Sequence, residues 1–86
     1  MNELRERFNS DSIRASTLKD GVRAIEQQMA RQGLGMRGDI READARVDYQ
    51  LKEAMDYIRK GDVEQARQAL QYAEGSMAQL AKFLGR

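Results

Sequence analysis

The apolar positions of residues 62–84 follow an alternating spacing of three and four, which predicts an amphipathic helix. The stripe consists of Val63, Ala66, Leu70, Ala73, Met77, Leu80 and Leu84. Such a stripe is the a/d seam of helices that pack side by side. Asp62 precedes it as a candidate N-cap and Gly85 follows it as a stop signal. We therefore predict a helix over about residues 62–84.

A second stripe predicts a helix over about residues 39–60, with Asp39 as its N-cap and Gly61 just past its end. Within this helix Asp44 and Asp48 form an acidic pair at i,i+4. We interpret the pair as part of a solvated helix face, because a hard-cation site needs several converging oxygens and no third ligand is evident. The apolar positions are Ile40, Val47, Leu51, Ala54 and Ile58.

The first helix is harder to delimit. Leu18, Val22, Ile25 and Met29 keep the heptad spacing, but its backward extension places Asp11 in the core and Ile13 on the outer face. A break in residues 9–12 would explain both. We therefore predict a helix over about residues 11–32, with its start between residues 11 and 18. Residues 1–10 are predicted to be either a short amphipathic segment that packs on the bundle through Leu4 and Phe8 or a frayed terminus.

The short connections at residues 33–38 and 60–61 make consecutive helices neighbours. The predicted fold class is therefore all-α, a small antiparallel three-helix bundle with no strands. Residues 1–86 form a single helical domain in this prediction, which combines a helical hairpin over residues 39–84 with the N-terminal helix. Met29, Met55 and Met77 are interpreted as core filler.

The connection "GLGMRGD" contains the integrin-binding tripeptide Arg37-Gly38-Asp39. We interpret it as a boundary between two helices, since glycine permits left-handed backbone after a helix end and the aspartate suits the next helix start. Leu34 and Met36 either cover the end of the bundle or project as a small contact patch.

The composition excludes most common chemistry. The 86 residues include no Cys, His, Trp or Pro. Without Cys and His, the chain lacks disulfides, thiolate and imidazole metal ligands, and the usual nucleophile and base pairs. We therefore expect no enzymatic activity, no catalytic residues, no cofactor-binding residues and no metal site.

The charge pattern does not favour nucleic acid as a partner. Fifteen basic and fourteen acidic residues give a net charge of +1 and are mixed along the chain, whereas nucleic-acid binders usually carry a basic excess. No apolar run approaches the roughly 20 residues of a membrane span, and the N-terminus lacks the apolar centre of a secretory signal. We expect a cytoplasmic protein that does not enter membranes.

Residues 54–73 resemble a tetratricopeptide helical hairpin. The resemblance covers about one repeat, has Gln50 and Glu53 where an aromatic residue and a leucine are expected, and has no second copy. It implies an αα-hairpin and does not identify a peptide groove. The matching positions are Ala54, Tyr57, Gly61, Val63, Ala66, Leu70 and Ala73.

These features predict a non-enzymatic helical module for protein–protein interaction or self-association. If the first helix is short, part of the apolar arc of residues 62–84 stays uncovered and favours a homodimer. The predicted partner-binding residues are Tyr72, Met77, Leu80, Phe83, Leu34 and Met36. The alternative is a small regulatory or inhibitory adaptor that acts on a nucleic-acid-processing machine. The basic residues considered for that role are Arg14, Arg23, Arg31 and Arg37.

Overall fold

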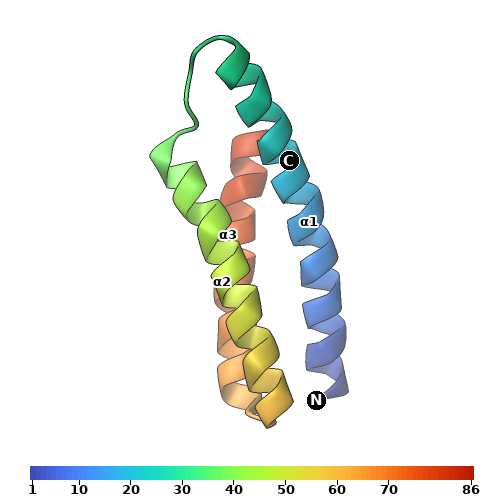
Figure 1. Cartoon of the computed structure of the whole chain (residues 1–86). Coiled ribbons are helices and arrows are strands. Elements are labelled where there is room, and N and C mark those ends of the chain that lie inside the picture. Colours follow the sequence, from blue (N-terminus) through green and yellow to red (C-terminus); the bar gives the residue numbers. More distant parts are fainter.

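Three helices make up the chain in a computed structural model that describes residues 1–86 (Figure 1). They are α1 (Asn2–Arg31), α2 (Gly38–Lys60) and α3 (Val63–Leu84). Consecutive helices run antiparallel and no strand is present, so the predicted all-α three-helix bundle is confirmed. The molecule measures 47 × 18 × 17 Å. At 1.5 Å per residue the 30 residues of α1 extend about 45 Å, so α1 runs the length of the bundle.

The hairpin of α2 and α3 closes as the sequence predicts. Gly61 adopts a left-handed conformation with φ of 77° and ends α2, a backbone angle that costs glycine little. The Asp62 carboxylate then accepts a hydrogen bond from the Gln65 amide at 3.2 Å. Asp62 is therefore the N-cap of α3, and the tight turn holds the two helices against each other.

The structure corrects the prediction for α1. The helix is continuous from Asn2 to Arg31, so the predicted break in residues 9–12 is wrong. Asp11 does occupy a core position and is only 9% exposed, while Ile13 faces solvent and is 71% exposed. Leu4 is buried against the hairpin, so residues 1–10 are the first turns of the main helix rather than a separate segment.

The start of α2 also differs from the prediction. The helix begins at Gly38 with Arg37 in the N-cap position, and no side chain caps it. The Asp39 carboxylate instead accepts two hydrogen bonds from the Arg37 guanidinium, at 3.1 and 2.7 Å. These bonds to Arg37 lower the pKa of Asp39 below its ordinary value. Both charged groups of the integrin-like tripeptide therefore engage each other at the helix start.

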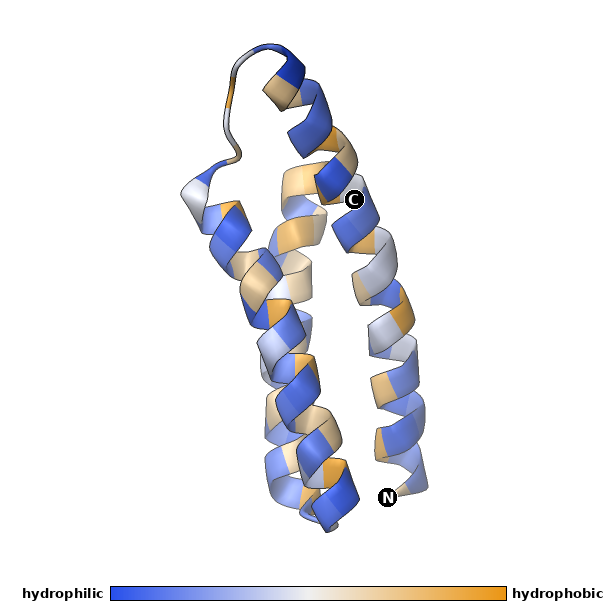
Figure 2. Ribbon diagram, in the orientation of Figure 1, coloured by the Kyte–Doolittle hydropathy of each residue, from blue (hydrophilic) through white to orange (hydrophobic).

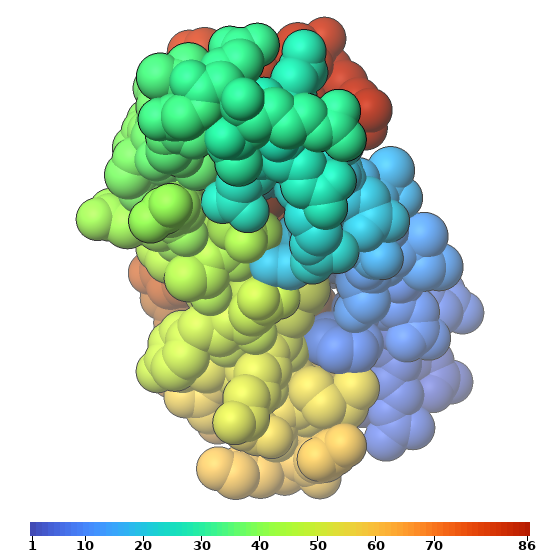
Figure 3. Space-filling view, turned by 45° about the horizontal axis from the view of Figure 1, so that its top comes forward, coloured from blue at the N-terminus to red at the C-terminus, as the bar shows by residue number.

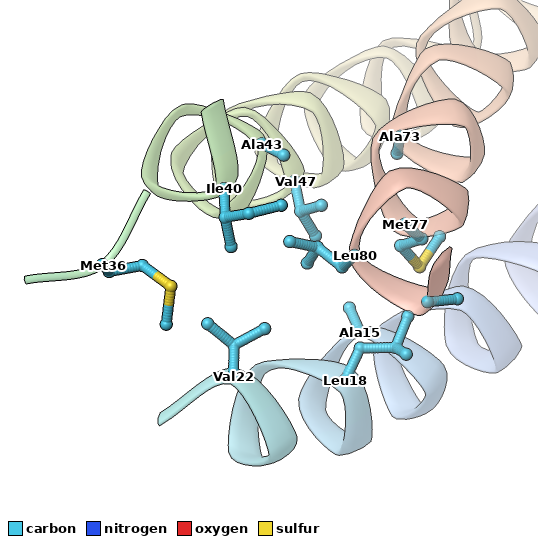
Figure 4. Close-up of a cluster of buried hydrophobic side chains, with 11 residues drawn as sticks. Ala15, Leu18, Val22, Met36, Ile40, Ala43, Val47, Ala73, Met77 and Leu80 are labelled. Carbon is cyan, nitrogen blue, oxygen red and sulfur yellow. The ribbon is translucent and has the colours of Figure 1, made fainter. Parts of the chain in front are cut away.

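The core forms two clusters along the bundle. Figure 2 shows hydrophobic positions recurring along each helix between hydrophilic ones, as expected for helices that bury one face. Figure 4 shows the larger cluster, in which side chains from all three helices and the first loop meet. Its members are Ala15, Leu18, Val22, Met36, Ile40, Ala43, Val47, Ala73, Met77, Leu80 and Ala81. The smaller cluster contains Leu4, Ala54, Ile58, Ala66, Ala69 and Leu70.

A lysine joins α1 to α2. Lys19 Nζ donates to Asp44 Oδ1 at 2.7 Å and to Asp48 Oδ2 at 2.8 Å. Partial burial lowers the pKa of Lys19, but the bonds to the two aspartates outweigh this effect and hold the pKa above its ordinary value. The two aspartates, which the sequence analysis interprets as part of a solvated helix face, therefore form ion pairs with Lys19.

Candidate functional site

Three of the predicted partner-binding residues are buried inside the bundle. Met77 and Leu80 are fully buried, and Met36 is only 7% exposed. Figure 4 shows Leu80 among side chains of α1 and α2. The predicted uncovered arc on α3 required a short first helix, whereas the full-length α1 covers these positions with Ala15, Leu18 and Val22. Met36, Met77 and Leu80 therefore belong to the core of the structure, where a partner does not reach them.

The other three predicted residues reach the surface at separate places. Leu34 is 54% exposed in the loop before α2, and Tyr72 is 57% exposed on α3. The Tyr72 hydroxyl accepts a hydrogen bond from Gln68 Nε2 at 3.1 Å. Phe83 is half-buried near the end of α3, with the Arg37 guanidinium carbon 5.8 Å from its ring centre. Because Met77 and Leu80 are buried in the core, they do not connect Leu34, Tyr72 and Phe83 into one exposed apolar patch.

A polar cluster lies where α1 meets α3. Arg7 Nε and Nη2 donate to the two carboxylate oxygens of Glu74 at 2.7 and 2.6 Å. Asp11 lies one turn further along α1, and its Oδ2 is buried without a hydrogen-bond partner. Burial, with the neighbouring Glu74 carboxylate, raises the pKa of Asp11 to about 7, although Arg7 and Arg14 act in the opposite direction. This cluster fixes the N-terminal half of α1 on α3.

The same half of α1 forms a cleft with the last turns of α2. We call it the α1–α2 cleft. Figure 1 shows the N-terminus of α1 at the end of the bundle where α2 turns into α3, and Figure 3 shows side chains of α1 beside those of α2 along the bundle. The cleft has a volume of about 270 Å³. Its lining residues are Arg5, Phe8, Asn9, Met55, Ile58 and Arg59.

The floor and rim of the α1–α2 cleft differ in chemistry. Ile58 is buried and Phe8 and Met55 are half-buried, so they provide an apolar floor. Arg5, Asn9 and Arg59 are exposed and surround it. An apolar floor with a few polar groups around it is the usual chemistry of a binding site.

The cleft contains no acidic side chain. Four other hollows on the surface each include at least one aspartate or glutamate among their lining residues. These hollows carry both signs of charge, whereas the cleft carries only positive charge. The acidic residues concerned include Glu53, Asp39, Asp44 and Asp48.

Two of the four arginines considered for a nucleic-acid-related role are paired within the chain. Arg23 lies 3.4 Å from Asp20, and Arg37 lies 2.7 Å from Asp39. Pairing of this kind reduces the positive charge that these side chains present to a phosphate backbone. The four residues also come from α1 and the loop after it, and none lines the α1–α2 cleft.

Comparison with known proteins adds no relative. No protein-family model, no curated protein and no solved structure matches the chain. Residues 54–73, whose spacing resembles a tetratricopeptide hairpin, lie across the turn between α2 and α3. No part of α1, α2 or α3 combines the length and the hydropathy that a membrane span requires.

Sequence reasoning did not identify the α1–α2 cleft. The sequence predicts Met55 as core filler, and the predicted break separates the first turns of α1 from the rest of the helix. The heptad register contained the missing signal, because Leu4, Phe8, Asp11, Ala15 and Leu18 continue the alternating spacing without interruption. Reading Asp11 as a tolerated core residue would have placed Phe8 against the hairpin.

Proposed function

We propose that this chain is a non-enzymatic module for protein–protein interaction that binds a segment of a partner protein in the α1–α2 cleft. The observation that supports this proposal is the open apolar floor of the cleft, formed by Phe8, Met55 and Ile58. Methionine adapts its shape to different partners, which suits it to a recognition surface.

The size of the cleft suits a single side chain of a protein partner. Pockets that enclose whole drug-sized ligands have volumes of about 300–1,000 Å³. At about 270 Å³ the α1–α2 cleft lies at the lower edge of this range. It suits one anchoring side chain of a larger partner, and anchors of this kind dominate the energy of many protein interfaces.

A second copy of the chain is the less favoured partner. The predicted homodimer relied on exposed apolar surface around Met77 and Leu80, and these side chains are buried. Tyr72 and part of Phe83 remain for self-association through α3. The α1–α2 cleft instead brings three apolar side chains, Phe8, Met55 and Ile58, into one lining.

Selection of short random peptides against the immobilised full chain tests this function. We expect selected peptides to bind the wild type and to lose at least about tenfold in affinity, about 1.4 kcal/mol, for Met55→Asn, which replaces an apolar side chain of the cleft floor by a shorter, polar and uncharged one. Tyr49→Asn is the matched control, because Tyr49 is an exposed residue of α2 outside the cleft. Circular dichroism checks that both variants keep their helices. Absence of selected peptides, or equal binding by Met55→Asn, would overturn the proposed function.

A further inference from the structure

The two arginines at the rim of the α1–α2 cleft have no acidic partner in the chain. Arg5 comes from the first turns of α1 and Arg59 from the last turn of α2, and both line the same cleft. Neither takes part in an ion pair. The basic residues that do are Arg7, Lys19, Arg23, Arg37, Arg46 and Arg67.

We propose that the partner segment carries an apolar side chain flanked by carboxylates, which bind Arg5 and Arg59 while the apolar side chain enters between them. This inference rests on the proposed function and specifies the partner of the same cleft. Phe8, Met55 and Ile58 contact the apolar side chain in this arrangement.

The guanidinium group suits this role for a geometric reason. Its planar donors match the two oxygens of a carboxylate and form parallel hydrogen bonds with it. Both arginines are exposed, so each pair alone contributes little, and the two pairs act together with the apolar anchor. Asn9, on the α1 side of the rim, adds an amide that can donate to and accept from the backbone of the bound segment.

The charge of the cleft favours acidic over basic or neutral segments. A basic segment would bring its charge next to Arg5 and Arg59, with no acidic side chain in the lining to offset the repulsion. A neutral segment would cover the two arginines without pairing them, and desolvation of an unpaired charge is unfavourable. An acidic segment satisfies both arginines. The arginines of the rim therefore distinguish acidic segments from basic and neutral ones, and the apolar floor binds the apolar side chain of the segment.

The sequences and affinities of the selected peptides test this proposal. We expect an apolar residue with neighbouring aspartate or glutamate to be enriched among them. Replacement of these acids by glutamine or asparagine should weaken binding at least about tenfold. The double variant Arg5→Gln, Arg59→Gln should weaken binding of the acidic peptides by at least the same factor, and increasing salt should weaken wild-type binding.

The matched control is the double variant Arg31→Gln, Arg41→Gln. It removes the same amount of charge at exposed arginines that lie outside the cleft and form no ion pair, and it should bind the acidic peptides as the wild type does. If the selected peptides lack acids, or bind the Arg5→Gln, Arg59→Gln variant unchanged, the partner chemistry is overturned while the proposed function stands. If no peptide is selected, the proposed function itself fails. Binding of phosphatidylserine vesicles through Arg5 and Arg59 without any peptide binding would also overturn the proposal.

Discussion

Replacement of Asp11 by leucine should stabilise the protein by about 1–3 kcal/mol at pH 8, because it removes a buried carboxylate oxygen that has no hydrogen-bond partner. Asp11 occupies a core position of α1, is 9% exposed, and has one carboxylate oxygen without a hydrogen-bond partner. Leucine would continue the apolar stripe between Leu4 and Ala15. Arg7 and Glu74 would keep their paired hydrogen bonds, so the substitution would leave no other charge unpaired.

The same carboxyl group should make wild-type stability depend on pH. Burial, with the nearby Glu74 carboxylate, raises the pKa of Asp11 from its ordinary 3.8 to about 7. The folded state therefore binds the Asp11 proton more tightly than the unfolded state. The resulting stabilisation is complete below the ordinary pKa and is lost as pH rises toward the folded-state pKa. Glu74 does not mask this change, because its hydrogen bonds with Arg7 lower the pKa of Glu74.

Urea unfolding followed by circular dichroism at about pH 5 and about pH 8 measures both effects. We expect the wild type to lose free energy of unfolding between these values, while Asp11→Leu and the isosteric Asp11→Asn do not. The chain has no histidine that would titrate in this window. A destabilised Asp11→Leu variant at pH 8, or a wild type of constant stability, would show that Asp11 does not lie in a desolvated core position.

Truncation of Leu80 to alanine should destabilise the protein by about 2–5 kcal/mol, as is typical of leucine-to-alanine changes in a packed core. Leu80 is fully buried and belongs to the larger core cluster. Tyr72→Ala is the matched control on the same helix, because Tyr72 is 57% exposed and surface substitutions usually change stability by no more than about 0.5 kcal/mol.

Urea unfolding and light scattering of the two variants separate a core role of Leu80 from an interface role. The structure predicts a large loss of stability for Leu80→Ala that is independent of protein concentration. Unchanged unfolding of Leu80→Ala, together with dissociation of an oligomer present in the wild type, would place Leu80 at an interface between copies.

The sequence was sufficient for the hairpin because its local signals agree with its packing. The regular seam from Val63 to Leu84 coincides with α3, and Gly61 and Asp62 act as the stop and the cap that their side chains suggest. Asp39 was an exception. Its carboxylate bonds to Arg37, two residues earlier, and a choice between a side-chain cap and a local ion pair cannot be made from residue types alone.

The N-terminal half of α1 was not predictable by the same reasoning. An aspartate at a core position is ordinarily a sign of a helix end or a register break. Here Arg7 binds Glu74 beside Asp11, and Glu74 lies 67 residues away in the sequence from Arg7. Only the packing of α1 on α3 brings these groups together. The helix continues through Asp11, and the burial of this residue raises its pKa.

The α1–α2 cleft depends on the same long-range packing. In the sequence, Arg5 and Phe8 fall in the segment predicted to be short or frayed. Met55 and Arg59 fall near the end of a predicted helix, and nothing in their residue types links them to Arg5 and Phe8. Their combination into a cleft requires α1 to extend unbroken to the turn between α2 and α3. The continuity of α1 is therefore the claim on which the cleft and both proposals rest.

Nuclear Overhauser effects of the Phe8 ring in the ¹³C-labelled full chain test this claim most directly. Phe8 and Met55 line the same cleft, together with the buried Ile58. The structure predicts cross-peaks from the Phe8 ring protons to the Met55 and Ile58 methyl groups, with helical backbone shifts through Asn9–Ser12. Coil-like shifts in that segment, with no cross-peak from Phe8 to α2, would contradict the continuous helix and remove the cleft.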